Sequence, residues 1–86
     1  MENKSIIVRL KLFSSAKELA GFDERSVELP SDSRSEAIFN YLSKHNPLFD
    51  RWKPSLRIAV NMEYVDSRHL LKDGDEVAII PPVSGG

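Results

Sequence analysis

"SDSRSEAIFNYLSKHNP", residues 31–47, decides the fold, because it has the clearest helical period in the chain. Ser33, with Glu36 three residues later, matches a capping box and predicts the start of a helix. Asn46 and Pro47 predict its end, since a residue before proline is disfavoured in helical conformation. The apolar side chains share one stripe, which predicts a helix with a single buried face: Ala37, Ile38, Tyr41 and Leu42.

Two alternating segments precede this helix. Residues 6–13, "IIVRLKLF", and residues 24–30, "ERSVELP", have the period of two that is typical of strands with one buried face. Pro30 has no amide hydrogen and predicts the end of the second strand. We expect the two strands to be antiparallel, with Ile6, Val8, Leu10, Leu12, Val27 and Leu29 inward and Ile7, Arg9, Lys11 and Phe13 outward.

A short helix is predicted between these strands, at residues 14–21, "SSAKELAG". Ser15 is expected to cap it, with Glu18 completing a second capping box. Gly21 stands where a left-handed residue is favoured at a helix end.

The second half of the chain predicts three further strands. Residues 48–55, "LFDRWKPS", have no clean period, and we expect Leu48, Phe49 and Trp52 to fold back as a lid on one end of the core. Residues 56–65 predict two short strands joined by a tight turn near Met62. An Asp73–Gly74 turn precedes the last strand, with Val77 and Ile79 on one face and Ala78 and Ile80 on the other.

One main helix between two groups of strands predicts an α+β fold with a mixed sheet on one side of the helix. The right-handed crossover rule places the last strand parallel to the first, in the middle of the sheet. This is the β-grasp, or ubiquitin-like, architecture, which we assign to residues 1–80, followed by a flexible functional tail at 81–86. Phe13 and Ile80 should then lie near one another where the tail leaves.

Composition restricts the function. The chain has 86 residues, 41% hydrophobic and 29% charged, with a formal net charge of -1, which favours neither nucleic acid nor membrane as a partner. Cysteine is absent, which excludes disulfides and thiolate chemistry and fits the cytosol. His45 and His69 have no clustered third ligand, so no metal site is predicted.

The last six residues, "PPVSGG", predict a tail that acts in another protein's active site. Fully extended, six residues reach about 20 Å. Pro81 and Pro82 favour an extended backbone, while Gly85 and Gly86 lack a Cβ and leave the terminal carboxylate open to attack. We therefore predict that Gly86 reacts after activation with ATP, accepting either an amine or sulfur, and that the residues before it thread into the partner: Pro81, Pro82, Val83, Ser84 and Gly85.

Three stretches carry a family resemblance: "LFSSAKELAG" at 12–21, "LKDGDEVAIIPP" at 71–82, and the terminal "PPVSGG". They resemble the small, sulfur-carrying subunit of molybdopterin synthase, the MoaD type. The resemblance implies that Gly86 is adenylated by an activating enzyme related to ubiquitin-activating enzymes and becomes a thiocarboxylate. It then donates sulfur to cyclic pyranopterin monophosphate, forming the molybdopterin dithiolene.

The resemblance also implies the partners. A large, MoaE-type subunit would receive the tail in a heterotetramer, and Phe13 and Ile80 would face it. The small subunit would be non-catalytic on its own and hold no permanent cofactor besides the covalent sulfur. The chain departs from the family in a few extra residues before the first strand and in the segment "NPLFDRWKPS" at 46–55, but not in the tail.

Other functions remain open on the same fold. One is sulfur transfer for thiamine or tRNA, or conjugation to other proteins, through the same glycine end. Another is a ubiquitin-like interaction module without tail chemistry. The basic run "RWK" at 51–53, with Arg57, resembles a small nucleic-acid patch, but the sequence shows no wider basic surface around it.

Overall fold

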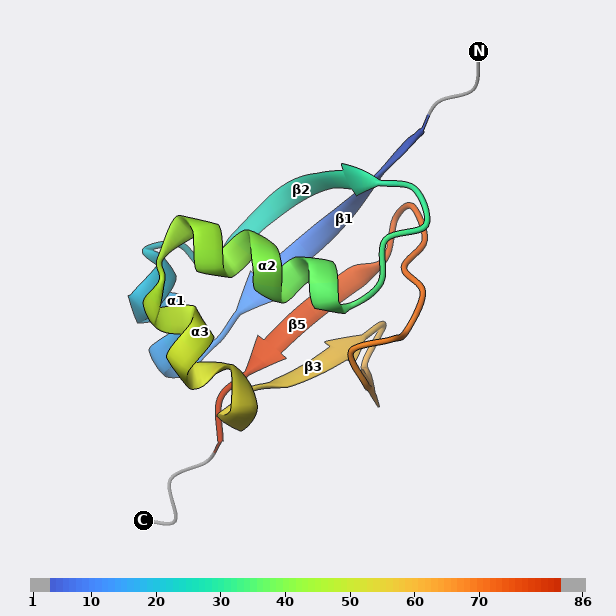
Figure 1. The fold of residues 1–86 in the computed structure, drawn as a ribbon. Coiled ribbons are helices and arrows are strands. Elements are labelled where there is room, and N and C mark those ends of the chain that lie inside the picture. The colour runs from blue at the N-terminus through green and yellow to red at the C-terminus, as the bar shows by residue number, and fades with distance from the viewer. Residues whose placement is uncertain (1–3, 83–86) are drawn as a thin grey trace.

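The computed structural model describes residues 4–82. Figure 1 shows one α-helix lying across a twisted sheet, with shorter helices at one end. In chain order the elements are β1 (Ser5–Leu12), α1 (Ser14–Ala20), β2 (Glu24–Pro30), α2 (Glu36–His45), α3 (Leu48–Trp52), the 3-10 helix η1 (Lys53–Ser55), β3 (Arg57–Val60), β4 (Glu63–Val65) and β5 (Glu76–Ile80).

The strand order is β2-β1-β5-β3-β4, with β1 and β5 parallel and the other neighbours antiparallel. In the central pair, Leu10 lies beside Val77 and Leu12 beside Ile79. The last strand therefore lies parallel to the first in the middle of a mixed sheet, as predicted. The β-grasp architecture is confirmed.

The core lies between α2 and the covered face of the sheet. All six side chains predicted to point inward from β1 and β2 are buried, as are Val77 and Ile79 of β5. From α2, Ile38 and Leu42 are buried as predicted, whereas Ala37 and Tyr41 are only partly buried. Phe39, which the predicted stripe omitted, is buried as well.

Both predicted capping boxes are wrong. The first helix begins at Ser14, with Phe13 at its N-cap and no side-chain cap, so Ser15 does not cap it. In front of α2, the Ser33 hydroxyl donates to the Pro30 carbonyl oxygen at 2.6 Å. The first amide of α2 finds its hydrogen-bond acceptor in the segment before Leu70 instead: the Glu36 amide donates to the Ser67 carbonyl oxygen at 3.0 Å. A backbone carbonyl that is distant in sequence therefore caps α2, where the sequence pattern predicted a side-chain cap.

The predicted helix ends and turns are confirmed. Gly21 has φ +85°, and its amide donates to the Lys17 carbonyl oxygen, closing α1. The β3–β4 connection is a two-residue turn in which Asn61 and Met62 both have positive φ, as in a type I′ hairpin. Gly74, with φ +88°, forms the turn before β5.

The segment that lacked a clear period forms α3 and η1, which close the tail end of the core. Phe49 is buried, and its ring meets the half-buried Trp52 ring edge-on, at 6.5 Å between centroids. The Asn46 side chain accepts a hydrogen bond from the Leu48 amide at the start of α3. The predicted lid is therefore confirmed for Phe49 and Trp52 but wrong for Leu48, whose side chain is exposed.

Replacing Phe49 with alanine tests the lid. Phe49 is 1% exposed and its neighbour Leu48 is 46% exposed, so substitutions at the two positions compare a buried with an exposed side chain in one helix. We expect Phe49→Ala to lower the free energy of unfolding by about 3–5 kcal/mol, because it leaves a cavity. Leu48→Ala should cost less than about 1 kcal/mol. Urea unfolding, followed through the single tryptophan, measures both values, and equal losses would contradict the lid.

Candidate functional site

The tail leaves the domain at the end of β5. There Ile79 pairs with Leu12 on one side, and Ile80 pairs with Arg57 on the other. Pro81 is buried and Pro82 is exposed. Val83, Ser84, Gly85 and Gly86, which include the predicted reactive end, lie outside the described residues.

The two predicted partner-facing residues lie at this exit. Phe13 follows the end of β1 and is 47% exposed, and Ile80 is half-buried on the outward side of β5. The parallel register pairs Leu12 with Ile79, so the next residue along each strand lies on the open face of the sheet. The structure thus places Phe13 and Ile80 at the same end of neighbouring strands.

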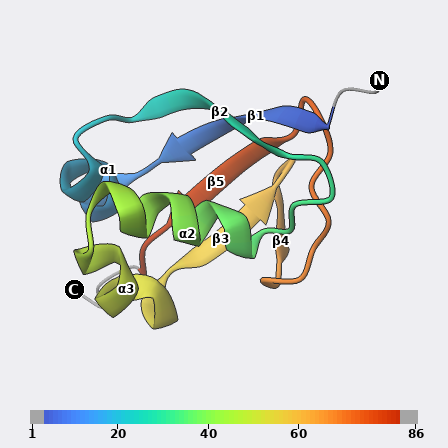
Figure 2. The same cartoon turned by 45° about the horizontal axis from the view of Figure 1, so that its top comes forward.

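A hollow of about 290 Å³ lies beside the tail root. Its walls include Arg51 and Trp52 of α3, Leu56, and the two prolines that begin the tail. Figures 1 and 2 both place α3 at the end of the molecule where β5 finishes. Sequence reasoning did not associate Arg51 or Trp52 with the tail, because no local pattern relates them to residues thirty positions later. The burial of Phe49, which anchors α3, brings them there.

His45 and His69 both lie within the described residues. Within residues 4–82, no group of three histidine, aspartate or glutamate side chains is arranged to hold a metal ion. His45 instead lies 2.6 Å through Nε2 from the Ala20 carbonyl oxygen, with its ring edge-on to Phe22. No helix in this part of the chain is long and apolar enough to cross a membrane.

The exit therefore combines three features: a tail root held by the core, outward apolar side chains beside it, and a hollow walled by α3. This arrangement can present a peptide end to a partner while the domain docks next to it. Chemistry on the peptide end itself would take place beyond Pro82.

Comparison with known proteins identifies relatives along the whole chain. The model of the ThiS family matches residues 10–86. A molybdopterin synthase sulfur carrier subunit from Chlamydomonas reinhardtii is 37% identical over 81 residues, covering 92% of this chain and 98% of the relative.

Solved structures agree with these matches. A putative molybdopterin converting factor subunit 1 from Pyrococcus furiosus has a TM-score of 0.82 at 34% identity, covering 91% of this chain and 99% of that one. Small archaeal modifier protein 1 from Methanosarcina acetivorans has a TM-score of 0.78 at 27% identity, with 98% and 100% covered. A complex of subunits 1 and 2 of molybdopterin-converting factor from Helicobacter pylori contains a chain with a TM-score of 0.64 at 26% identity, with 94% and 100% covered.

The family match covers nearly all of the domain and extends through the tail, and the similar structures share the β-grasp sheet. The resemblance drawn from "LFSSAKELAG", "LKDGDEVAIIPP" and "PPVSGG" is thereby confirmed. The chain belongs to the ThiS family, as a relative of the molybdopterin synthase sulfur carrier subunits.

Proposed function

We propose that this protein is the sulfur carrier subunit of a molybdopterin synthase. The observation that carries the proposal is the match to a curated carrier subunit at 37% identity over 98% of that relative's length. A match of this extent includes the whole carrier and not only a shared fold. The terminal "PPVSGG" supplies the peptide end that such a carrier needs.

The proposed chemistry takes place on the carboxylate of Gly86. An activating enzyme of the ubiquitin-activating type would join this carboxylate to the α-phosphate of ATP, releasing pyrophosphate. A sulfur nucleophile would then attack the acyl carbon and release AMP, leaving a thiocarboxylate. The chain has no cysteine, so a covalently carried sulfur in transferable form belongs on the tail end. From there the sulfur would pass to cyclic pyranopterin monophosphate, and water would return the Gly86 end to a carboxylate. Two such transfers would supply the two sulfur atoms of the dithiolene.

A large synthase subunit is the proposed receiver of the tail, in a heterotetramer. The Helicobacter pylori structure, a complex of subunits 1 and 2 of molybdopterin-converting factor, supports a two-subunit assembly. Phe13 and Ile80, beside the tail exit, supply apolar contact area for it. The chain would act in the cytosol and catalyse nothing on its own, because the activating enzyme and the large subunit supply the catalytic groups.

Protein conjugation is the second candidate. The likeness to small archaeal modifier protein 1, a modifier by name, favours it. The two functions share activation of Gly86 and differ in the acceptor, which is sulfur in one case and an amine in the other. Sulfur transfer for thiamine or tRNA differs only in the final receiver.

The mass of the intact protein tests the carrier chemistry. We expect protein purified from cells that express its activating enzyme to gain the mass difference between one sulfur and one oxygen, because one carboxylate oxygen is replaced. A variant lacking Gly86 should show no gain, since its tail ends one residue short. An unmodified mass in the full-length protein, without adenylation, would refute the proposal, and covalent adducts with other proteins would favour conjugation.

Phe13→Ala tests the docking face. We expect it to weaken binding to the large subunit about tenfold in Kd, because an exposed aromatic residue beside the exit is a candidate hot spot. Ile7→Ala is the matched control: Ile7 is 52% exposed on the same face of β1 but at the opposite end. Isothermal titration calorimetry measures both affinities. Equal affinities for Phe13→Ala and the unmodified protein would refute the assignment.

A further inference from the structure

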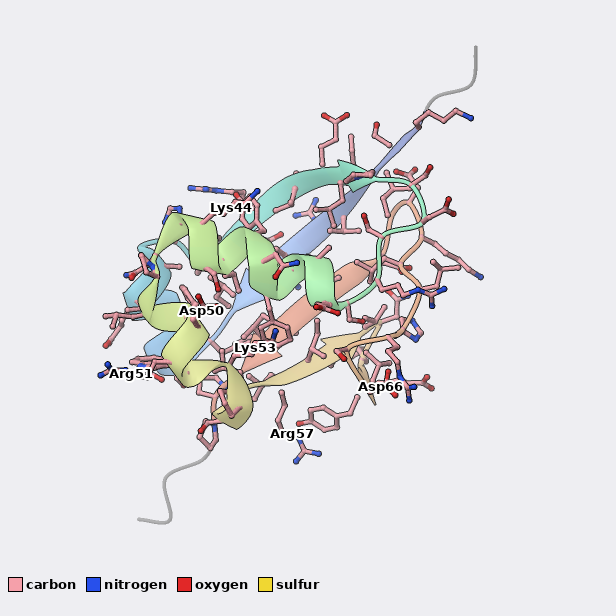
Figure 3. The ribbon with its side chains drawn as sticks, viewed as in Figure 1. Lys44, Asp50, Arg51, Lys53, Arg57 and Asp66 are labelled. Atoms are coloured by element: carbon pink, nitrogen blue, oxygen red, sulfur yellow. The ribbon has the colours of Figure 1, made fainter. Side chains whose placement is uncertain are left out.

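Three cationic side chains lie near the tail exit: Arg51 of α3, Lys53 of η1 and Arg57 of β3. We call them the exit cations. Figure 3 shows them in the lower half of the view, where the tail leaves the domain, with Asp66 to the right of Arg57. Arg57 lies opposite Ile80 in the sheet register, and Arg51 lines the same hollow as Pro81 and Pro82. The one acid within residues 44–57, Asp50, accepts a hydrogen bond from the Ser43 hydroxyl.

Two of the exit cations rest on aromatic rings. The Lys53 ammonium lies 5.8 Å from the centre of the Phe39 ring, and the Arg57 guanidinium carbon lies 4.4 Å from the centre of the Tyr64 ring. Such contacts hold a cation in place without neutralising its charge. Within the described chain, the ion pairs are Arg9–Glu24, Lys11–Glu76 and Arg68–Asp66, so none includes an exit cation.

The surface between the exit cations is concave and partly apolar. A groove of about 430 Å³, bordered by Lys53 and Arg57, has Phe39, Leu56 and Val65 among its walls. Leu56, which follows η1, lines both this groove and the hollow beside the tail root, so the two depressions adjoin at the end of η1. A surface of this kind can receive apolar side chains and carboxylates from the same partner segment.

Charge is unevenly distributed along the sequence. Residues 51–57 contain the three exit cations and no acid, whereas residues 61–76 contain five acids against two basic residues: Glu63, Asp66, Asp73, Asp75 and Glu76 against Arg68 and Lys72. A locally positive segment in a chain with a net charge of -1 can attract an oppositely charged segment of a partner.

We propose that the exit cations and the grooves beside them bind an acidic, partly apolar segment of the large synthase subunit that receives the tail. This inference rests on the proposed function and deepens it, because it assigns the α3–η1 segment a part in recognition. A protein partner fits better than nucleic acid, since the grooves beside the exit cations have apolar walls, which suit apolar side chains rather than phosphates. The contact would steer the tail root toward the receiving channel.

The test compares two double variants that remove the same charge. Arg51→Gln with Lys53→Gln removes two exit cations, whereas Arg68→Gln with Lys72→Gln removes two cations within residues 61–76. The probe is the large subunit from the same organism, and Kd is measured at low and high salt. We expect the first pair to raise Kd about tenfold at low salt and to weaken its salt dependence, because exposed interface charges act through long-range attraction. The second pair should leave Kd within about twofold of the unmodified protein.

A charge-keeping variant separates charge from folding. Arg51→Lys with Lys53→Arg should retain binding close to that of the unmodified protein, and thermal unfolding of each variant checks that the domain is intact. Equal Kd values for the two glutamine pairs would overturn the exit-cation proposal while leaving the carrier function standing. No binding by the unmodified protein would overturn both. Tight binding of a DNA duplex, lost only with Arg51→Gln and Lys53→Gln, would overturn the acidic partner in favour of nucleic acid.

Discussion

The parallel pairing of β1 with β5 is the constraint on which the rest of the structure depends. Leu10, Leu12, Val77 and Ile79 bury this pair at the centre of the sheet, facing α2. Parallel neighbours cannot be joined by a tight turn, so the intervening chain must cross over the sheet, and α2 does this. Parallel strands also end at the same edge. The pairing therefore fixes both the covered face and the place where Phe13 and the tail emerge together.

Most of this fold could be predicted because its information is local. Alternation along β1 and β2 identifies the buried side chains directly, and the stripe on α2 identifies Ile38 and Leu42. The capping serines could not be placed, since the amides at the start of α2 bond to carbonyl oxygens more than thirty residues away. The α3 helix escaped prediction for another reason, because five residues are too few to show a period.

The candidate site also contains residues that the sequence could predict and residues that it could not. Phe13 and Ile80 follow from alternation combined with the parallel register, both of which the sequence carries. The positions of Arg51 and Trp52 cannot be predicted in this way. These residues lie beside the tail root because Phe49, in the same helix, packs into the core. The burial of Pro81 is likewise a tertiary feature: the composition of "PPVSGG" predicts an extended tail but not how firmly its first residue is held. The position of a residue along a strand can be predicted from the local sequence, whereas contacts between segments that are distant in sequence depend on the tertiary structure.

The placement of the tail root has a consequence for how a carrier with two partners would work. Under the proposed function, an activating enzyme and a large subunit must each enclose the residues beyond Pro82. Both must then approach the one end of the domain where Phe13 and the α3 hollow flank the tail. Two proteins cannot occupy that end together, so activation and delivery would exclude each other and follow in sequence. Release from the first partner is then a necessary step, which favours exposed charges and modest apolar contacts over a large permanent interface.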